Sequence, residues 1–180
     1  MRALVIYESM FGNTQLIAKA VAEGLARHGK ADLIEVSQAT GPLPADLSLL
    51  IIGGPTHAFG MSRAKTRESA AQQGTGPLIS PGEGIREWLE NAPKISPQTL
   101  TASFDTKIAK PAWLPGSAAR SAMKRLKRFG LPIAAPPESF YVNDTTGPLA
   151  DGELARAQLW GDTLGSLAAR KASTSSGITP

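Results

Sequence analysis

The sequence contains no cysteine and only two histidines, His28 and His57. The lack of cysteine excludes a disulfide framework, a thiolate nucleophile and a zinc site built on thiolates. Two histidines leave little for a metal site made of nitrogen ligands alone. We therefore predict neither a metal site nor thiol chemistry.

Long apolar runs are also missing. The longest cover residues 3–7 and 47–52, whereas a membrane-spanning helix needs about 20 apolar residues. The beginning of the chain lacks the charged, apolar and small-residue order of a signal peptide. We therefore expect no membrane insertion and a cytoplasmic location.

The charge of the chain is mildly positive, with 19 Lys and Arg against 15 Asp and Glu, and a pI of about 9.6. This excess allows an anionic partner, but it is too small to argue for nucleic acid, and we expect no nucleic-acid binding. Hydrophobic residues make up 42% of the 180 residues, which is typical of a folded chain. We expect a single domain over residues 1–171, followed by a disordered tail, rich in Ser, Thr and Gly, over residues 172–180.

Apolar runs and helical periodicities alternate along this domain. Strands are expected at residues 2–7, 32–36, 48–52, 99–104 and, interrupted by two prolines, 131–142. Helices are expected at residues 14–28, 85–89, 117–129 and 151–170. The glycines and proline at 53–55 are expected to end the third strand, and residues 61–82 are expected to form an extended loop. Such alternation predicts an α/β fold with a doubly wound parallel sheet and helices on both faces.

Ligands of such sheets bind beyond the carboxyl ends of the strands, so the loops there are the place to look for a site. Residues 9–14 (SMFGNT) lie between the first strand and the first helix. A helix N-terminus offers unpaired N–H groups and partial positive charge, and Gly12 allows a close backbone approach. The loop therefore suits a phosphate, although Asn13 or Thr14 could also be a simple helix cap. Neither GxxxxGK[ST] nor GxGxxG occurs, which argues against a nucleotide triphosphatase and a dinucleotide site.

The loop at residues 9–14 resembles the FMN-phosphate loop of flavodoxins, written T/S-x-T-G-N-T. Residues 55–60 (PTHAFG) resemble the second flavin loop of flavodoxin-like proteins, and residues 103–106 (SFDT) occupy the place of the third. The resemblance spans about residues 2–170 and implies a five-stranded parallel sheet in the order 2-1-3-4-5 with FMN as cofactor. The expected cofactor-binding residues are Ser9, Met10, Phe11, Gly12, Asn13, Thr14, Pro55, Thr56, His57, Ala58, Phe59, Gly60, Ser103, Phe104, Asp105 and Thr106.

The resemblance also implies roles within this set. Residues 9–14 would hold the phosphate, and Thr56 and Asn13 would lie near the ribityl chain. The ring would lie between residues 57–60 and 103–107, with stacking candidates Phe59, His57, Phe104 and Trp113. Gly60 is the candidate for the peptide that turns toward the flavin N5 atom, because glycine can adopt positive φ. Phe59 could equally be a core residue under its loop, and Gly60 a simple turn residue.

The sequence departs from the family in three respects. Phe11 stands where flavodoxins commonly have Thr, the connection at 61–82 is long, and the chain is basic where most flavodoxins are acidic. Arg63, Lys65, Arg67, Lys107 and Lys110 are the cations expected near the flavin, and they suggest redox partners with acidic docking surfaces.

The predicted function is an FMN electron carrier between redox partner proteins, with no catalytic residue of its own. An FMN-dependent NAD(P)H:quinone-type oxidoreductase, which would use residues 60–82 to form a pocket over the ring, and a flavin-free scaffold or regulatory domain are the alternatives.

Overall fold

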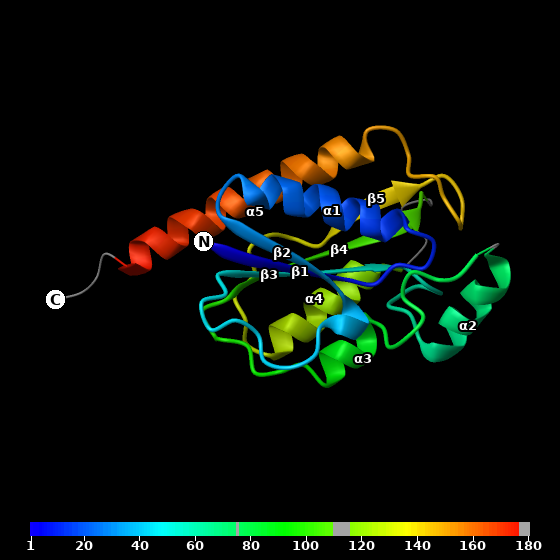
Figure 1. The fold of residues 1–180 in the computed structure, drawn as a ribbon, viewed down its shortest axis with the longest axis horizontal. Coiled ribbons are helices and arrows are strands. Elements are labelled where there is room, and N and C mark those ends of the chain that lie inside the picture. The colour runs from blue at the N-terminus through cyan, green and yellow to red at the C-terminus, as the bar shows by residue number, and fades with distance from the viewer. Residues whose placement is uncertain (75, 110–115, 177–180) are drawn as a thin grey trace.

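The computed structural model describes residues 1–74, 76–109 and 116–176. Its strands are β1 (Arg2–Tyr7), β2 (Lys30–Glu35), β3 (Leu49–Pro55), β4 (Leu100–Ile108) and β5 (Glu138–Val142). Its helices are α1 (Asn13–Ala26), the 3₁₀ helix η1 (Val36–Gln38), α2 (Ala64–Gln73), α3 (Ile85–Glu90), α4 (Ala118–Arg128) and α5 (Glu153–Ser176). The strands form one parallel sheet in the order β2-β1-β3-β4-β5, which confirms the predicted fold class (Figure 1).

Helices cover both faces of the sheet, with α1 and α5 on one side and α3 and α4 on the other (Figure 1). The central strands β1 and β3 are almost completely buried because both of their faces are covered. Alternate residues of β1 therefore enter different cores: Val5 packs toward α1 and α5, and Ile6 toward α3 and α4. Burial on both faces explains why the two strands appear as continuous apolar runs.

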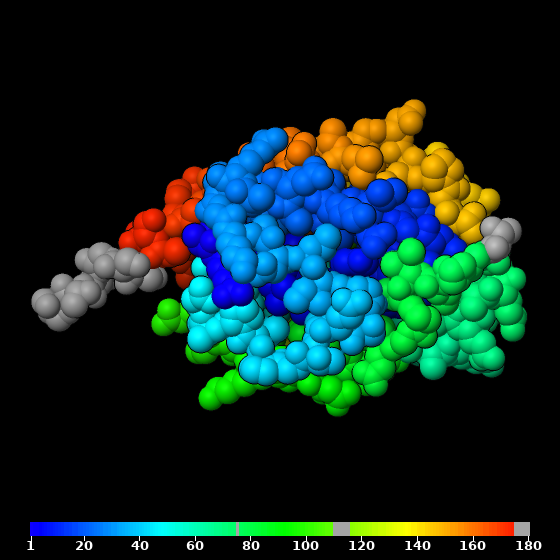
Figure 2. Space-filling view, in the orientation of Figure 1, coloured from blue at the N-terminus to red at the C-terminus, as the bar shows by residue number. Residues whose placement is uncertain are grey.

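Helices α1 and α5 pack closely because glycines face the backbone of the neighbouring helix. A Cβ atom on Gly24 would lie 2.1 Å from the carbonyl oxygen of Gln158, and one on Gly161 would lie 2.2 Å from that of Val21. The helices run side by side along the surface in Figure 2. Because β1 leads directly into α1, this contact fixes the helix whose N-terminus carries residues 9–14.

Strands β3 and β4 extend further than the sequence indicates. Gly53, Gly54 and Pro55, which were expected to end the strand, continue β3 and pair with residues 104–106 of β4. Gly53 has no side chain because the Phe104 ring occupies that space: a Cβ on Gly53 would be 2.0 Å from the ring carbon Cζ. Gly53 is thus a packing glycine within the sheet, and residues 103–106 belong to a strand.

Two other segments differ from their expected structures. Residues 61–82, expected to form an extended loop, contain α2, whose buried residues are Arg67 and Ala70. The residue range 172–180 was expected to be a disordered tail, but α5 continues to Ser176. Residues 177–180 lie outside the described part of the chain.

None of the helices in the described ranges is long and apolar enough to cross a membrane. Within the same ranges, no three His, Asp or Glu side chains gather as a metal site would require.

Candidate functional site

A cleft of about 660 Å³ lies at the carboxyl ends of the strands. Its volume falls within the range of about 300–1,000 Å³ that is typical of small-molecule sites. Eleven of the predicted residues line it: Ser9, Met10, Phe11, Asn13, Thr14, Pro55, Thr56, His57, Ala58, Phe59 and Thr106. The cleft also has lining residues that were not among the predicted cofactor-binding set, namely Thr66, Ser69, Ala70, Gln73, Lys107, Ile108, Gly116, Arg120, Tyr141, Val142 and Thr145.

Residues 9–14 form one end of the cleft, between β1 and α1. Ser9 is fully buried, and its Oγ atom accepts hydrogen bonds from the amides of Gly12 at 3.1 Å and Gln15 at 3.3 Å. Gly12 stands before α1 in the left-handed conformation, with φ of 93°, and its side-chain direction is open. Glycine is required here by conformation, and its position at the helix start leaves room for a ligand.

The N-terminus of α1 has unused hydrogen-bond donors. The N-cap residue, Gly12, has no side chain with which to cap the helix, and the first turn has no acidic residue. Among the described residues, none accepts a hydrogen bond from the backbone amides of Phe11, Asn13 or Thr14. These donors at the positive end of the helix favour an anion.

Two side chains of this loop are directed toward other parts of the protein. The amide of Asn13 donates to the Thr146 carbonyl at 3.0 Å, which connects α1 to the loop after β5. The Thr14 hydroxyl lies 2.7 Å from that of Thr106 on β4. Asn13 therefore positions the loop after β5 at the rim of the cleft, and Thr14 joins the start of α1 to β4.

The second loop is a tight turn whose ends, His57 and Gly60, exchange two backbone hydrogen bonds of 2.8 Å. Positive φ occurs at Ala58 (39°) and Phe59 (75°), and not at Gly60, where it was predicted. A Cβ on Gly60 would point toward Ser121 and Arg86, and Gly60 is not among the lining residues. Phe59, by contrast, lines the cleft and is 58% exposed, which excludes the alternative that it fills the core.

The residues of the third predicted loop have three different surroundings because side chains alternate along a strand. The Phe104 ring is buried against Phe140 and Trp160 in edge-to-face contacts, so it cannot stack on a ligand in the cleft. The Ser103 hydroxyl donates to the Ala119 carbonyl at 2.9 Å. Only Thr106, near the strand end, lines the cleft. Trp113 and Lys110, the other candidates near this loop, lie outside the described residues.

Asp105 lies beneath the cleft without lining it. Its Oδ2 atom accepts hydrogen bonds from Thr56 Oγ1 (2.9 Å), Ser117 Oγ (2.6 Å) and the Ala119 amide (3.0 Å). Thr56 Oγ1 in turn accepts from the Ala118 amide at 2.9 Å. The buried carboxylate thus joins the end of β3 to the start of α4, and it orients Thr56, whose donor is already used.

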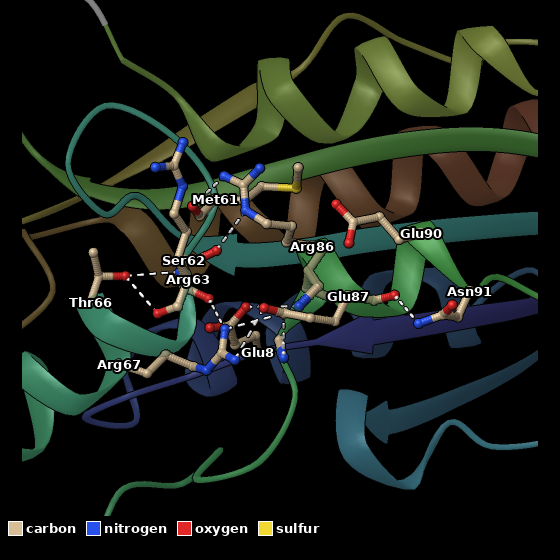
Figure 3. Close-up of polar contacts among 12 residues, drawn as sticks. Glu8, Met61, Ser62, Arg63, Thr66, Arg67, Arg86, Glu87, Glu90 and Asn91 are labelled. Carbon is tan, nitrogen blue, oxygen red and sulfur yellow. Dashed lines mark hydrogen bonds and ion pairs between the residues drawn. The ribbon is translucent and has the colours of Figure 1, made fainter.

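Helix α2 forms a further wall of the cleft. Arg67 anchors this helix to residues outside it (Figure 3). The buried guanidinium donates to Ser62 Oγ at 2.9 Å and to both carboxylate oxygens of Glu87 at 3.2 Å. Glu8, at the end of β1, lies beside this ion pair and accepts from the Ile85 amide at 2.9 Å. Burial raises the pKa of the Glu8 carboxyl, against the lowering influence of that amide and of Arg67.

The charge of the cleft is entirely positive among the described residues that line it. Lys107 and Arg120 supply two cations, and no Asp or Glu is present in the lining. His57 is kept neutral more strongly than an ordinary histidine, because burial and the nearby Arg67 guanidinium lower its pKa, although a hydrogen bond with the Thr66 backbone opposes them. A polar, cationic cleft with unused amides at one end fits an anionic ligand.

Comparison with known proteins agrees with this arrangement. A family model described as flavodoxin matches residues 5–80, which include the first two of the three predicted flavin loops and α2. Over these residues the chain is similar to flavodoxins. No curated protein matches the sequence.

Solved structures of flavodoxins have the same fold. A flavodoxin from the domain Archaea is 16% identical, with a TM-score of 0.61, over 93% of this chain and 99% of its own. Flavodoxin 1 from Bacillus cereus is 14% identical, with a TM-score of 0.64, over 92% of this chain and 98% of its own. The Flv1 flavodiiron core from Synechocystis sp. PCC6803 is 19% identical, with a TM-score of 0.61, over 96% of this chain and 36% of its own. At these identities the similarity establishes the fold.

Only some of the lining residues that were missed could have been found from a signal in the sequence. Four of them recur at helical spacing, namely Thr66, Ser69, Ala70 and Gln73. Because this pattern is mostly polar, it indicates a helix only once the side that faces the cleft is known. Tyr141 alternates with the buried Phe140 and Val142 on β5, so its position on the other side of that strand could have been found.

Proposed function

We propose that the protein binds FMN and carries electrons between redox partners. The observation that carries this proposal is the end of the cleft at residues 9–14, where three lining residues have backbone amides without an acceptor among the described residues and the lining contains no acidic residue. A terminal phosphate monoester is dianionic near neutral pH and accepts several hydrogen bonds, so it matches this set of donors. The match to the flavodoxin family model supports the same ligand.

The residues present fit the rest of the cofactor as well. Phe59 and Tyr141, both cleft-lining aromatics, can contact a planar ring, and Thr56 keeps a lone pair to accept from a ribityl hydroxyl. Lys107 and Arg120 stabilise negative charge that a flavin gains when it is reduced. When bound, FMN supplies the capacity to accept and release single electrons, and the protein positions it at the carboxyl edge of the sheet.

The phosphate assignment can be tested with two matched glycines. Gly12 and Gly41 both have positive φ (93° and 86°) and open space around a Cβ, so alanine causes similar backbone strain at both positions. We expect Gly12→Ala to weaken FMN more than riboflavin, and Gly41→Ala to change neither affinity, as measured by quenching of flavin fluorescence. Failure of the wild-type protein to bind FMN would refute the proposed function, and equal losses for FMN and riboflavin would refute the placement of the phosphate.

The partner proposed for this carrier has an acidic docking surface. Arg120, Lys124, Lys127 and Arg128 lie exposed along α4, a helix with no acidic residue, and the first of them lines the cleft. The cationic character extends beyond α4: burial, and then the nearby charges of Arg63 and Arg125, lower the pKa of Arg86, which lies behind Gly60. A basic face next to the cleft favours encounter with an acidic protein.

Small oxidants of opposite charge test this surface without a known partner. We expect reoxidation of the reduced FMN-loaded protein by anionic ferricyanide to slow as salt is added, and reoxidation by a cationic ruthenium ammine complex to accelerate. Lys124→Glu combined with Lys127→Glu should weaken both salt effects. Salt effects of equal sign for the two oxidants would contradict the proposal.

Turnover of NAD(P)H separates the carrier from the oxidoreductase alternative. A carrier needs a separate reductase, so the isolated protein should not oxidise NAD(P)H with a quinone acceptor. Rapid turnover would favour the enzyme. The cytoplasmic location and the absence of nucleic-acid binding remain predictions.

A further inference from the structure

Helix α2 directs a polar stripe into the cleft. Thr66, Ser69, Ala70 and Gln73 follow one another at spacings of three, one and three residues, which places them on one face of the helix. Arg67 leaves the helix in a different direction, toward Ser62 and Glu87 (Figure 3). The buried ion pair therefore fixes the rotation of α2 about its axis, and with it the face that the cleft receives.

The helix also has a defined direction along the cleft. Its first turn lies at the end of the cleft formed by the second loop, since Thr66 lines the cleft together with His57. Its last turn lies against the first loop, because a Cβ on Gly74 would be 2.9 Å from Cε1 of Phe11. The chain after α2 remains at that loop, where Ile79 and Ser80 donate to the Met10 and Ser9 carbonyls at 3.0 and 2.9 Å.

Gln73 is therefore on the part of α2 nearest to the predicted phosphate loop. This is also where the chain lacks a donor, since Phe11 occupies the position at which flavodoxins commonly have a hydroxyl. The side-chain amide of Gln73 has two N–H donors, whereas the Ser69 hydroxyl one turn earlier donates to the Lys65 carbonyl and keeps a lone pair with which to accept. Both side chains line the same cleft as Phe11 and Thr14.

We infer that α2 is a ligand-binding wall of the site, in which Gln73 donates a hydrogen bond to the phosphate end of FMN and Ser69 contacts the adjoining ribityl chain. The inference rests on the proposed function, because it assumes that FMN occupies the cleft. It assigns to α2 a task that the loop at residues 9–14 performs alone in the T/S-x-T-G-N-T pattern. The residues that carry it, Ser69 and Gln73, come from the segment expected to be a loop.

The neighbouring glutamines of α2 provide a matched pair of variants. Gln72 and Gln73 are both exposed, but only Gln73 lines the cleft, so Gln72→Ala and Gln73→Ala remove the same group from adjacent positions. We expect Gln73→Ala to raise the Kd for FMN about tenfold, which corresponds to about 1.4 kcal/mol, and to raise the Kd for riboflavin less than threefold. Gln72→Ala should leave both values within twofold of wild type.

Ser69→Ala provides a second measurement, with a different expected pattern. Its hydroxyl donates only to the Lys65 carbonyl within the same helix, at 3.1 Å, so its loss should not unfold α2. Because Ser69 is assigned to the ribityl chain, the variant should weaken FMN and riboflavin by similar factors of about three. Circular dichroism and the melting temperature of the three variants should match those of wild type.

Each result has a defined meaning. Equal FMN affinities of Gln72→Ala and Gln73→Ala, in a protein that binds FMN, would overturn the inference and leave the proposed function intact. Equal losses of FMN and riboflavin in Gln73→Ala would overturn the assignment to the phosphate end. Failure of wild type to bind FMN would instead refute the proposed function itself.

Discussion

Replacement of Gly161 by Ala tests the close packing of α1 against α5. In an unconstrained helix this change is stabilising by about 1 kcal/mol, because alanine has the higher helix propensity. In this protein the new Cβ would lie 2.2 Å from the Val21 carbonyl oxygen and 3.0 Å from two further backbone atoms of Val21. Backbone atoms cannot rotate away as a side chain can, so the two helices must separate.

The expected loss follows from these opposing effects. Overpacking of a dense core costs about 1–3 kcal/mol. A clash with the backbone of the neighbouring helix belongs in the upper half of that range. After subtraction of the propensity gain, we expect Gly161→Ala to lower the free energy of unfolding by about 1–2 kcal/mol. Urea denaturation followed by circular dichroism measures this difference.

Gly165→Ala is the matched control, one helical turn further along α5. Its Cβ would meet the side chain of His28, with the nearest atom Cδ2 at 2.7 Å, and no backbone atom is among its three nearest contacts. A side chain can move at the low end of the overpacking cost, about 1 kcal/mol, which the propensity gain of about 1 kcal/mol offsets, so we expect a net change within about 0.5 kcal/mol. If Gly161→Ala were as stable as Gly165→Ala, the packing distance between α1 and α5 described here would be wrong.

Two further predictions concern the polar groups around α2. The pKa of His57 lies below 6.5 in the folded protein, so as pH falls the unfolded chain takes up the proton first, and this histidine makes stability fall below about pH 6.5. His57→Gln should therefore reduce the loss of stability between about pH 7 and pH 5.5, as measured by urea denaturation. An unchanged pH dependence would refute the assignment. Glu8, whose pKa is raised above 4.5, acts in the opposite direction and is present in both proteins. Glu87→Gln should lower the free energy of unfolding by about 1–3 kcal/mol, because it leaves the Arg67 guanidinium buried without its counter-charge. Arg125→Gln, which removes an ion pair on the surface, should lower the free energy of unfolding by less than about 1 kcal/mol. Equal losses in the two denaturation curves would contradict the role given to Arg67.

The central strands of the sheet and the first loop could be predicted from the sequence because they depend on local signals, whereas the strand order was implied by the resemblance to flavodoxins. The runs at residues 2–7 and 48–52 are apolar on both faces, which is the mark of central strands in a parallel sheet. Gly12 marks the left-handed residue before α1 because glycine adopts that conformation without a Cβ clash. The predicted sheet order is confirmed, and the left-handed conformation of Gly12 is a finding of the structure.

Helix α2 could not be predicted because tertiary contacts decide its structure. Its sequence, AKTRESAAQQ, has no apolar stripe, and it is anchored by an arginine whose partner, Glu87, lies 20 residues further along the chain. Phe104 was misplaced for a related reason. Whether an aromatic residue near a strand end faces a core or a cleft depends on where the strand ends, and Gly53 across the sheet, which makes room for its ring, is visible only in three dimensions.

The turn at Ala58 and Phe59 has a consequence for any effort to make this protein more thermostable. Both residues hold positive φ without being glycine, a conformation that costs an L-residue about 1–2 kcal/mol. A screen for heat resistance would therefore favour glycine at position 58, which relieves the strain. The same replacement would let the backbone beside Phe59 sample many more shapes, and the cleft would lose a wall that is already in place before any ligand arrives. At this turn, relief of backbone strain and a preformed binding surface are therefore competing demands.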